Sequence, residues 1–294
     1  MSAVGIIANP SSGKDIRRLV ARGSVFDNNE KANIVRRALL GLDSVGVRRV
    51  LYMPDHFAIV PRALDGARLG LEAESLPMPI GGDQRDSTLA AELLVAMGAV
   101  CIITLRLLVA MGAVCIITLG GDGTNRAVAR GCGAVPLVPV STGTNNVFPV
   151  VVEGTLAGLA AGLLATRAVD SASTVQPCKR LEILVDGEPT DIALIDAALS
   201  RERFVGSRAI WDPRGVLELV LSTAEPGSLG LSAIGAHLSP VGRRDPGGLH
   251  LRLGESAARG LAAEEPRRVL APIAPGLVVP VAVQSCRPIP AAPP

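Results

Sequence analysis

A buried-strand pattern that runs directly into a glycine-rich turn constrains this chain more than any other feature. The apolar residues 114–119 lead into Gly120-Gly121-Asp122-Gly123-Thr124-Asn125-Arg126, and residues 127–130 then suit a helix. Glycines let backbone N–H groups approach an anion without a Cβ in the way, and a following helix adds the positive end of its dipole. The junction predicts a phosphate site between a strand and a helix.

Asp122 is the acidic residue of this turn. A carboxylate would repel a phosphate unless it binds Mg²⁺ or accepts a proton from a substrate hydroxyl, and phosphoryl transfer requires both of these roles. The sequence therefore predicts Asp122 as the catalytic residue and as a candidate Mg²⁺ ligand.

The composition fits a globular chain and argues against several kinds of partner. The 294 residues are 48% hydrophobic, which allows a large core and suits two domains of ordinary size. A formal net charge of +2 and an aromatic content of 2% argue against a nucleic-acid partner. The five cysteines have no CxxC spacing and residues 1–9 lack the features of a signal peptide, so we expect a cytoplasmic protein with a small-molecule substrate.

Thirteen residues occur twice in succession. The segment LLVAMGAVCIITL at residues 93–105 recurs unchanged at residues 107–119, with Arg106 between the copies. This is a tandem duplication or a sequence-assembly error, because repeat architectures need several diverged units with periods of roughly twenty residues or more. Each apolar run is too short to cross a membrane, and Arg106 would lie near the centre of a longer span, so we expect no membrane segment.

The two copies compete for one place in the fold. Ser87-Thr88 is predicted to cap a helix that runs along LAAELLVAM and stops at Gly98 or Gly112, with VCIITL as the buried strand that follows. Because only the second copy leads into the glycine-rich turn, residues 114–119 are predicted as the functional strand. The first copy is surplus, either as a helix extension through Arg106 or as an additional strand.

The first half of the chain alternates between strand and helix patterns. Strands are predicted at residues 4–8, 49–53 and 134–140, and helices at residues 14–22 and 29–40. This alternation favours a mainly parallel sheet with helices on both faces, in which ligands lie beyond the carboxyl ends of the strands.

Two further polar loops follow predicted strands. The first, Asn9-Pro10-Ser11-Ser12-Gly13-Lys14, lacks the spacing of a Walker A loop, but its hydroxyls and the basic residues 14, 17 and 18 suit a phosphate; a solvated basic helix is the alternative. The second is Ser141-Thr142-Gly143-Thr144-Asn145-Asn146. One such cluster is most often only a turn, but three at successive strand ends suggest a common cleft.

Together these motifs resemble the NAD kinase and diacylglycerol kinase superfamily, whose hallmark is a GGDGT loop. The nearest likeness is to its ATP-NAD kinase-like branch of the acetoin catabolism protein X type. It extends to IRRLVARGSVFDNNEKANIVRR near the start, SRERFVGSRAIWDP from residue 200, GLSAIGAHL from residue 230 and APIAPGL from residue 271. The resemblance implies an N-terminal Rossmann-like α/β domain with a parallel sheet, a C-terminal β-rich domain, and an active site between them.

The resemblance also implies cofactors and roles. ATP with Mg²⁺ would be the phosphoryl donor, NAD(H) is a candidate acceptor, and Asp122 would orient or deprotonate the acceptor hydroxyl. Copies of the chain would associate through the second domain. The nucleotide-binding set carried over to this sequence is Asn9, Ser12, Gly13, Lys14, Gly120, Gly121, Gly123, Thr124, Asn125, Thr142, Gly143, Thr144 and Asn145.

One departure from the family concerns the acceptor. NAD kinases hold the acceptor dinucleotide with an Asn-Glu pair, and its nearest counterpart here is Ile195-Asp196. Asp196 is therefore a substrate candidate, with a buried or strand-end role as the alternative. Arg201 and Arg203 are candidates for clamping phosphate, with surface pairing to Glu202 as the alternative.

The second half is richer in strand signals. A helix is predicted at residues 156–166, and strands at residues 181–185, 192–199, 216–221, 249–253 and 278–283. We expect a Rossmann-like domain over residues 1–148, a β-rich domain over residues 149–285 and a Pro/Ala-rich tail over residues 286–294.

The function expected from these observations is a small-molecule kinase that moves the γ-phosphoryl group of ATP onto a hydroxyl near Asp122. Two alternatives stay open. A lipid or sphingoid kinase also suits the Asn-Pro-x-Ser-Gly element, and a nucleotide-binding regulatory protein would keep the loops without turnover.

Overall fold

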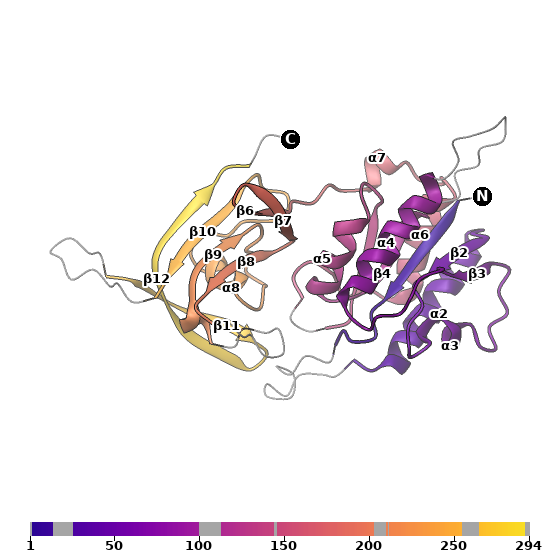
Figure 1. Ribbon diagram of the computed structural model, residues 1–294, viewed down its shortest axis with the longest axis horizontal. Coiled ribbons are helices and arrows are strands. Elements are labelled where there is room, and N and C mark those ends of the chain that lie inside the picture. The colour runs from indigo at the N-terminus through magenta and orange to yellow at the C-terminus, as the bar shows by residue number, and fades with distance from the viewer. Residues whose placement is uncertain are drawn as a thin grey trace. The chain divides into compact units, whose positions relative to one another are not determined.

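The computed structural model of the chain describes residues 2–13, 26–99, 113–143, 146–202, 210, 212–254 and 265–291 (Figure 1). Its contacts divide the described chain into two units. The first contains residues 2–13, 26–143 and 148–176, and the second contains residues 146–147 and 177–291.

The first unit is built on a five-stranded parallel sheet with the order β3-β2-β1-β4-β5. The strands are β1 (Ala3–Ala8), β2 (Arg49–Tyr52), β3 (Glu72–Ser75), β4 (Ala113–Gly120) and β5 (Leu137–Ser141). The strand order reverses between β1 and β4, which is where open α/β sheets bind their ligands. The predicted parallel sheet is confirmed.

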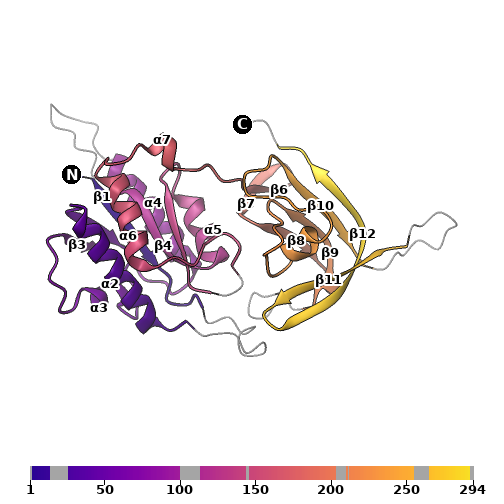
Figure 2. The ribbon, with the colours of Figure 1, turned by 180° about the vertical axis from the view of Figure 1, so that it is seen from behind.

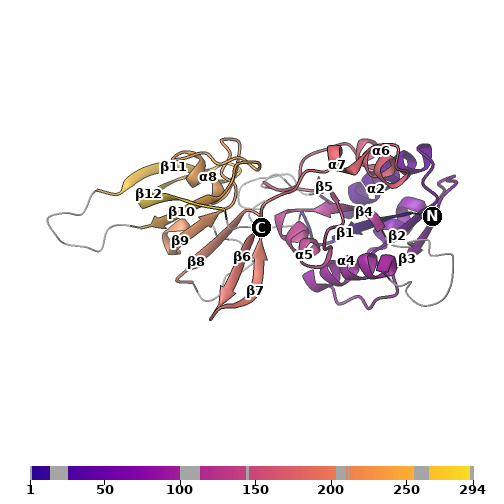
Figure 3. The same ribbon diagram turned by 90° about the horizontal axis from the view of Figure 1, so that it is seen from above.

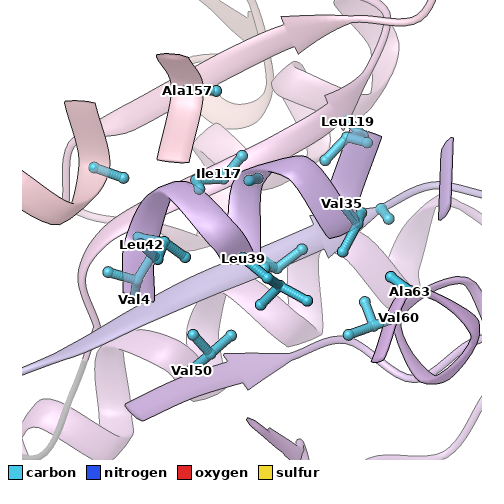
Figure 4. Close-up of a cluster of buried hydrophobic side chains, with 14 of the residues drawn as sticks. Val4, Val35, Leu39, Leu42, Val50, Val60, Ala63, Ile117, Leu119 and Ala157 are labelled. Carbon is cyan, nitrogen blue, oxygen red and sulfur yellow. The ribbon is translucent and has the colours of Figure 1, made fainter. Parts of the chain in front are cut away.

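Helices cover both faces of this sheet (Figure 3). α2 (Asn28–Ser44), α3 (Ile59–Leu64) and α6 (Gly154–Ala165) pack on one face, and α4 (Gln84–Ala99) and α5 (Asp122–Gly131) on the other; the short α7 (Ser171–Thr174) follows α6. Every residue of β1 is buried: Val4 and Ile6 enter the core under α2, and Ala3 and Ile7 the core under α4. Figure 4 shows Val4 among the side chains of α2. The doubly covered sheet explains why its strands are continuous apolar runs.

Small residues bring α2 and α6 into close backbone contact. A Cβ on Gly158 would overlap the carbonyl oxygen of Ala38, and one on Gly41 would lie 2.5 Å from the carbonyl oxygen of Thr155. This packing places α6 in the first unit. The first unit therefore extends to Gln176, beyond the domain boundary expected after residue 148.

The start of α4 differs from the sequence expectation. The helix begins at Gln84, so Ser87 is an interior residue and not the N-cap. The carboxylate of Asp86 accepts hydrogen bonds from the backbone N–H groups of Gly81 (2.9 Å) and Gly82 (2.8 Å), which holds residues 84–86 in the first turn. Ser87 is buried and donates to the sulfur of Met53 instead.

The two copies of the repeat have different structures. Residues 93–99 of the first copy continue α4, and the second copy provides β4, as predicted. The alternatives for the rest of the first copy, residues 100–105, lie outside the described residues, as does the helix predicted at residues 14–22.

Deleting one copy is expected to stabilise the first unit. Removing residues 100–113 joins Ala99 directly to Val114 and regenerates the uninterrupted sequence LLVAMGAVCIITL. The deletion removes fourteen residues from the connection between α4 and β4. Because each doubling of the length of a connection costs about 0.6 kcal/mol, we expect the free energy of unfolding to rise by about 1–2 kcal/mol. Urea unfolding, monitored by hydrogen exchange of peptides from β4, measures the change in the free energy of unfolding.

A matched variant separates loop length from competition between the copies. Polar, glycine-rich residues in place of residues 100–105 keep the length of the chain but remove the apolar segment of the first copy, so this variant should gain little stability. Unfolding of the first unit on deletion would contradict the prediction, because it would mean that the removed residues carry part of the fold.

The second unit is β-rich, as predicted (Figure 2). Its antiparallel sheet has the order β11-β12-β10-β9-β8, beside a separate hairpin of β6 and β7. Ala233 and Ile234 of α8 are buried against this sheet. The elements are β6 (Leu181–Val185), β7 (Glu188–Ala193), β8 (Asp196–Ser200), the 3₁₀ helix η2 (Pro213–Gly215), β9 (Val216–Leu221), α8 (Ser232–Ala236), β10 (Gly248–Leu253), β11 (Arg267–Ala274) and β12 (Leu277–Ile289).

Two strand expectations in this unit need correction. Residues 192–199 form parts of two strands, β7 and β8, because the chain turns at the buried residues 194–195. Residues 286–289, expected as the start of a tail, extend β12: Pro288 pairs with Leu249 and Ile289 with Gly248 of β10. This pairing orders a segment whose composition alone does not require order.

Two further observations concern the described helices and cysteines. Among the described helices, none combines the length and the hydropathy that crossing a membrane requires. The described cysteines, at positions 115, 132, 178 and 286, are free thiols. Burial raises the pKa of the Cys115 thiol to about 12, so this residue behaves as a small apolar core side chain.

Candidate functional site

Three polar loops lie at the carboxyl edge of the parallel sheet. They follow β1, β4 and β5, which are neighbours in the sheet, and they flank the point at which the strand order reverses. We call them the first loop (residues 9–13), the glycine turn (residues 120–124) and the third loop (residues 142–143). All three belong to the first unit.

Hydrogen bonds join the three loops directly. The side-chain amide of Asn9 donates to the hydroxyl of Thr124 (2.9 Å), which links the first loop to the glycine turn. Thr142 of the third loop donates through its hydroxyl to Ser12 (2.9 Å) and through its backbone N–H to the carbonyl of Gly120 (3.3 Å). These bonds show that the three loops lie together, while the common cleft and the binding role stay predictions.

Asp122 is the first residue of α5, with Gly121 as the N-cap. The helix therefore begins earlier than residue 127, where the sequence pattern placed it. The carboxylate is half-buried, and its Oδ1 accepts a hydrogen bond from the backbone N–H of Phe148 at 2.7 Å. Both this donor and the positive end of the helix dipole stabilise negative charge on the carboxylate.

The glycines of the turn have two different surroundings. A Cβ on Gly120 would overlap the side chain of Thr124, so this position is reserved for glycine by the packing of the turn itself. Gly123 is exposed in the first turn of α5, and a Cβ there would meet no atom within 4 Å. Gly123 therefore presents open backbone, which is what close approach of a phosphate requires.

Several predicted ligands are turned inward. Asn125 is fully buried: its side-chain oxygen accepts from Thr118 (2.7 Å), and its side-chain nitrogen donates to the carbonyl of Gly121 (3.0 Å). Thr124 and Thr142 are also buried, and their hydroxyls make the loop-to-loop bonds described above. These three side chains hold the loops in shape, so the backbone of the turn and Asp122 are the candidates within the turn for contact with a ligand.

Lys31 of α2 contacts the first loop, although no sequence motif marks it as a site residue. Its side chain is fully buried, and its ammonium donates to the backbone carbonyls of Asn9, Pro10 and Ser12. A lysine within an amphipathic helix pattern gives no signal of this role, because lysines on helices are usually solvated.

Each half of the chain matches the model of a known protein family. Residues 4–168 match the ATP-NAD kinase N-terminal domain, and residues 179–293 match the acetoin catabolism protein X C-terminal domain. A protein named acetoin catabolism protein X from Cupriavidus necator is 43% identical over 292 residues, which cover 95% of this chain and 76% of that protein. The chain belongs to the acetoin catabolism protein X family.

The three polar loops of this acetoin catabolism protein X family member all fall within the kinase-like match. The two matched regions end and begin at residues 168 and 179, on either side of Gln176, where the contacts divide the chain. The predicted ligands Lys14, Thr144 and Asn145 lie outside the described residues.

The remaining candidates lie in the family's C-terminal domain. Asp196 is the first residue of β8, opposite Leu221 of β9, and it is half-buried. Arg201 follows β8, and its side chain lines a cavity of about 870 Å³ together with three other arginines, at positions 214, 252 and 268. Arg203 lies outside the described residues. The role of these residues toward a substrate stays a prediction.

Proposed function

We propose that this member of the acetoin catabolism protein X family is a kinase that transfers the γ-phosphoryl group of ATP to a hydroxyl of NAD or a related metabolite. One observation carries the proposal: a half-buried carboxylate, Asp122, begins a helix directly after a glycine turn, at the edge where the strand order reverses. Glycine backbone suits phosphates, and a carboxylate beside it suits the acceptor hydroxyl or a metal ion.

In this proposal each part of the turn has a separate task. The open backbone at Gly123 and the N-terminus of α5 bind and orient the phosphates. Asp122 accepts the proton of the acceptor hydroxyl, and the hydrogen bond from Phe148 fixes the carboxylate's direction. The inward hydrogen bonds of Thr124 and Thr142 keep the loops from rearranging as the nucleotide binds.

The residues of the turn fit a Mg²⁺ ion that arrives with the nucleotide. Among the described residues, no group of three His, Cys, Asp or Glu side chains could hold a metal ion by itself. Magnesium in kinase sites is usually held by one or two carboxylates together with substrate phosphates, so Asp122 alone would suffice on the protein side. When bound, the ion would neutralise charge on the phosphates.

The acceptor pocket is expected to differ from that of NAD kinases. Ile195 stands in place of the asparagine of the Asn-Glu pair that NAD kinases use to hold the acceptor. Ile195 is buried, and its backbone carbonyl accepts from the N–H of Ser222. An apolar, buried side chain cannot hydrogen-bond a ribose. We therefore propose an acceptor held by other polar groups, with Asp196 as the remaining member of that pair.

A γ-phosphate transfer assay tests this function. Radiolabelled ATP with Mg²⁺ is incubated with the full chain and a panel of NAD, NADH, hydroxylated metabolites and lipid micelles, and we expect label in a water-soluble hydroxylated acceptor. Label in the micelle arm would identify a lipid kinase instead. Binding of ATP with no labelled product over the whole panel would support the non-catalytic alternative and overturn the proposal.

A further inference from the structure

A buried ammonium lies at the centre of the first loop. Among the described residues, Lys31 Nζ has four oxygens around it: the carbonyls of Asn9 (2.9 Å), Pro10 (3.1 Å) and Ser12 (2.7 Å), and the side-chain oxygen of Asn28 (3.1 Å). We call these four oxygens the carbonyl cage. An ammonium has only three protons to donate, so four close oxygens exceed one acceptor for each proton. The arrangement resembles the coordination of a small cation by oxygens. Taking a charge out of water is costly, and the cage supplies the compensation that burial requires.

The cage also fixes the direction of the loop's N–H groups. In a planar trans peptide, the carbonyl of one residue and the N–H of the next point in opposite directions. With the carbonyls of Pro10 and Ser12 turned toward Lys31, the N–H groups of Ser11 and Gly13 point away from it. Asn9 accepts the N–H of Ser11 on its side chain at 2.9 Å.

Gly13 completes this arrangement. Its φ of +78° lies in the left-handed region, and a Cβ would lie 2.8 Å from the carbonyl oxygen of Thr142 in the third loop. The loop therefore has a carbonyl side around Lys31 and an amide side that includes the N–H of Gly13. An amide side next to a glycine turn is suited to an anion.

We infer that Lys31 is a positioning residue whose ammonium occupies a monovalent-cation cage, and that it thereby holds the amide side of the first loop in the shape that binds the nucleotide phosphates. The positioning of the phosphate-binding amide side rests on the proposed function, whereas the cation cage does not. Lys31 acts through the loop and is not assigned to the chemistry of transfer.

Chemical rescue tests the cage in the full chain. Lys31→Ala removes three methylene groups and the ammonium, which together match n-propylammonium. We expect the variant to lose about 5–10 °C in Tm, because the part-buried carbonyls of Pro10 and Ser12 lose the ammonium donor. Propylammonium or ammonium chloride should restore most of this loss. Tetramethylammonium, which has no N–H donors, should not.

Lys31→Met is the matched control. Methionine fills the space of the lysine stem without a charge, so we expect a similar loss in Tm and no rescue by any amine. If amines raise the Tm of Lys31→Ala no more than that of Lys31→Met, the cage is not a cation site and the inference falls.

Nucleotide affinity tests whether Lys31 positions the loop for phosphate binding. The Kd of a fluorescent ATP analogue should rise at least about tenfold in Lys31→Ala and return toward the unsubstituted value with propylammonium. Rescue of Tm without rescue of Kd, in a chain that binds ATP, would overturn the positioning role. If the unsubstituted chain binds no nucleotide at all, the proposed function fails. The Tm experiment still shows whether the carbonyl cage is a cation site.

Discussion

Replacing Asp122 by asparagine is expected to lower the rate of phosphoryl transfer by about 10²–10⁴-fold, the range attributed to a positioned general base. Asparagine has nearly the same shape, and its side-chain oxygen can still accept the hydrogen bond from Phe148 that Asp122 accepts at 2.7 Å. The substitution removes the negative charge and the proton acceptor but keeps the local geometry. The turnover number for the acceptor found in the transfer assay measures the effect.

Asp170→Asn is the matched control for this prediction. Asp170 is also a carboxylate at the start of a helix in the first unit, where it accepts the N–H of Ser173 at 3.1 Å. Asparagine is an equally good N-cap, so this variant should keep both stability and turnover. Full transfer activity in Asp122→Asn would refute the assignment of Asp122 as base or metal ligand. Unchanged Tm in both variants would show that any loss of rate is chemical.

The parts of the fold that sequence predicted well are the strands buried on both faces. β1 and β4 are apolar because helices cover both sides of the sheet, so a continuous run of apolar residues marks each of them. Polar residues follow these strands at once. The proximity of the three loops follows from this arrangement, because adjacent parallel strands end at the same edge.

Elements with weaker signals depend on the rest of the fold. β3 has the sequence Glu-Ala-Glu-Ser at the edge of the sheet and pairs only with β2 among the described strands, so no apolar pattern marks it. The start of α4 depends on Asp86 reaching back to two glycine N–H groups, which no rule about Ser87 anticipates. In each case the deciding contact comes from the folded backbone and not from local propensity.

The inner and outer residues of the candidate site could not be told apart from sequence. Hydroxyls and amides serve equally well as ligands and as internal hydrogen-bonding groups. Only the folded loops show that Thr124 and Asn125 bond inward and that Gly123 faces open space. Lys31 has a role that its sequence pattern does not indicate, because its carbonyl partners lie in a loop more than eighteen residues earlier in the chain.

The two glycines at positions 120 and 123 are expected to respond in opposite ways to alanine. In Gly120→Ala the new Cβ would lie 2.5 Å from the hydroxyl oxygen of Thr124, closer than the side chain can accept without a backbone shift. Overpacking of this kind costs about 1–3 kcal/mol and would also break the hydrogen bond from Asn9 to Thr124. We expect lower stability of the first unit in urea, seen as faster hydrogen exchange in peptides from β4 and α5.

Gly123→Ala should leave that stability unchanged or raise it by up to about 1 kcal/mol, because alanine favours a helix more than glycine does. The open space around Gly123 means that the Cβ would meet no atom beyond its own stretch of helix, so a loss of function at unchanged stability would point to contact with a ligand. If phosphates approach this backbone as proposed, the Cβ should weaken ATP binding by at least about tenfold, measured as the Kd of a fluorescent ATP analogue. A folded Gly123→Ala protein with unchanged affinity would place the phosphates elsewhere. The pair therefore separates a glycine that the turn needs in order to fold from a glycine that the nucleotide needs in order to bind.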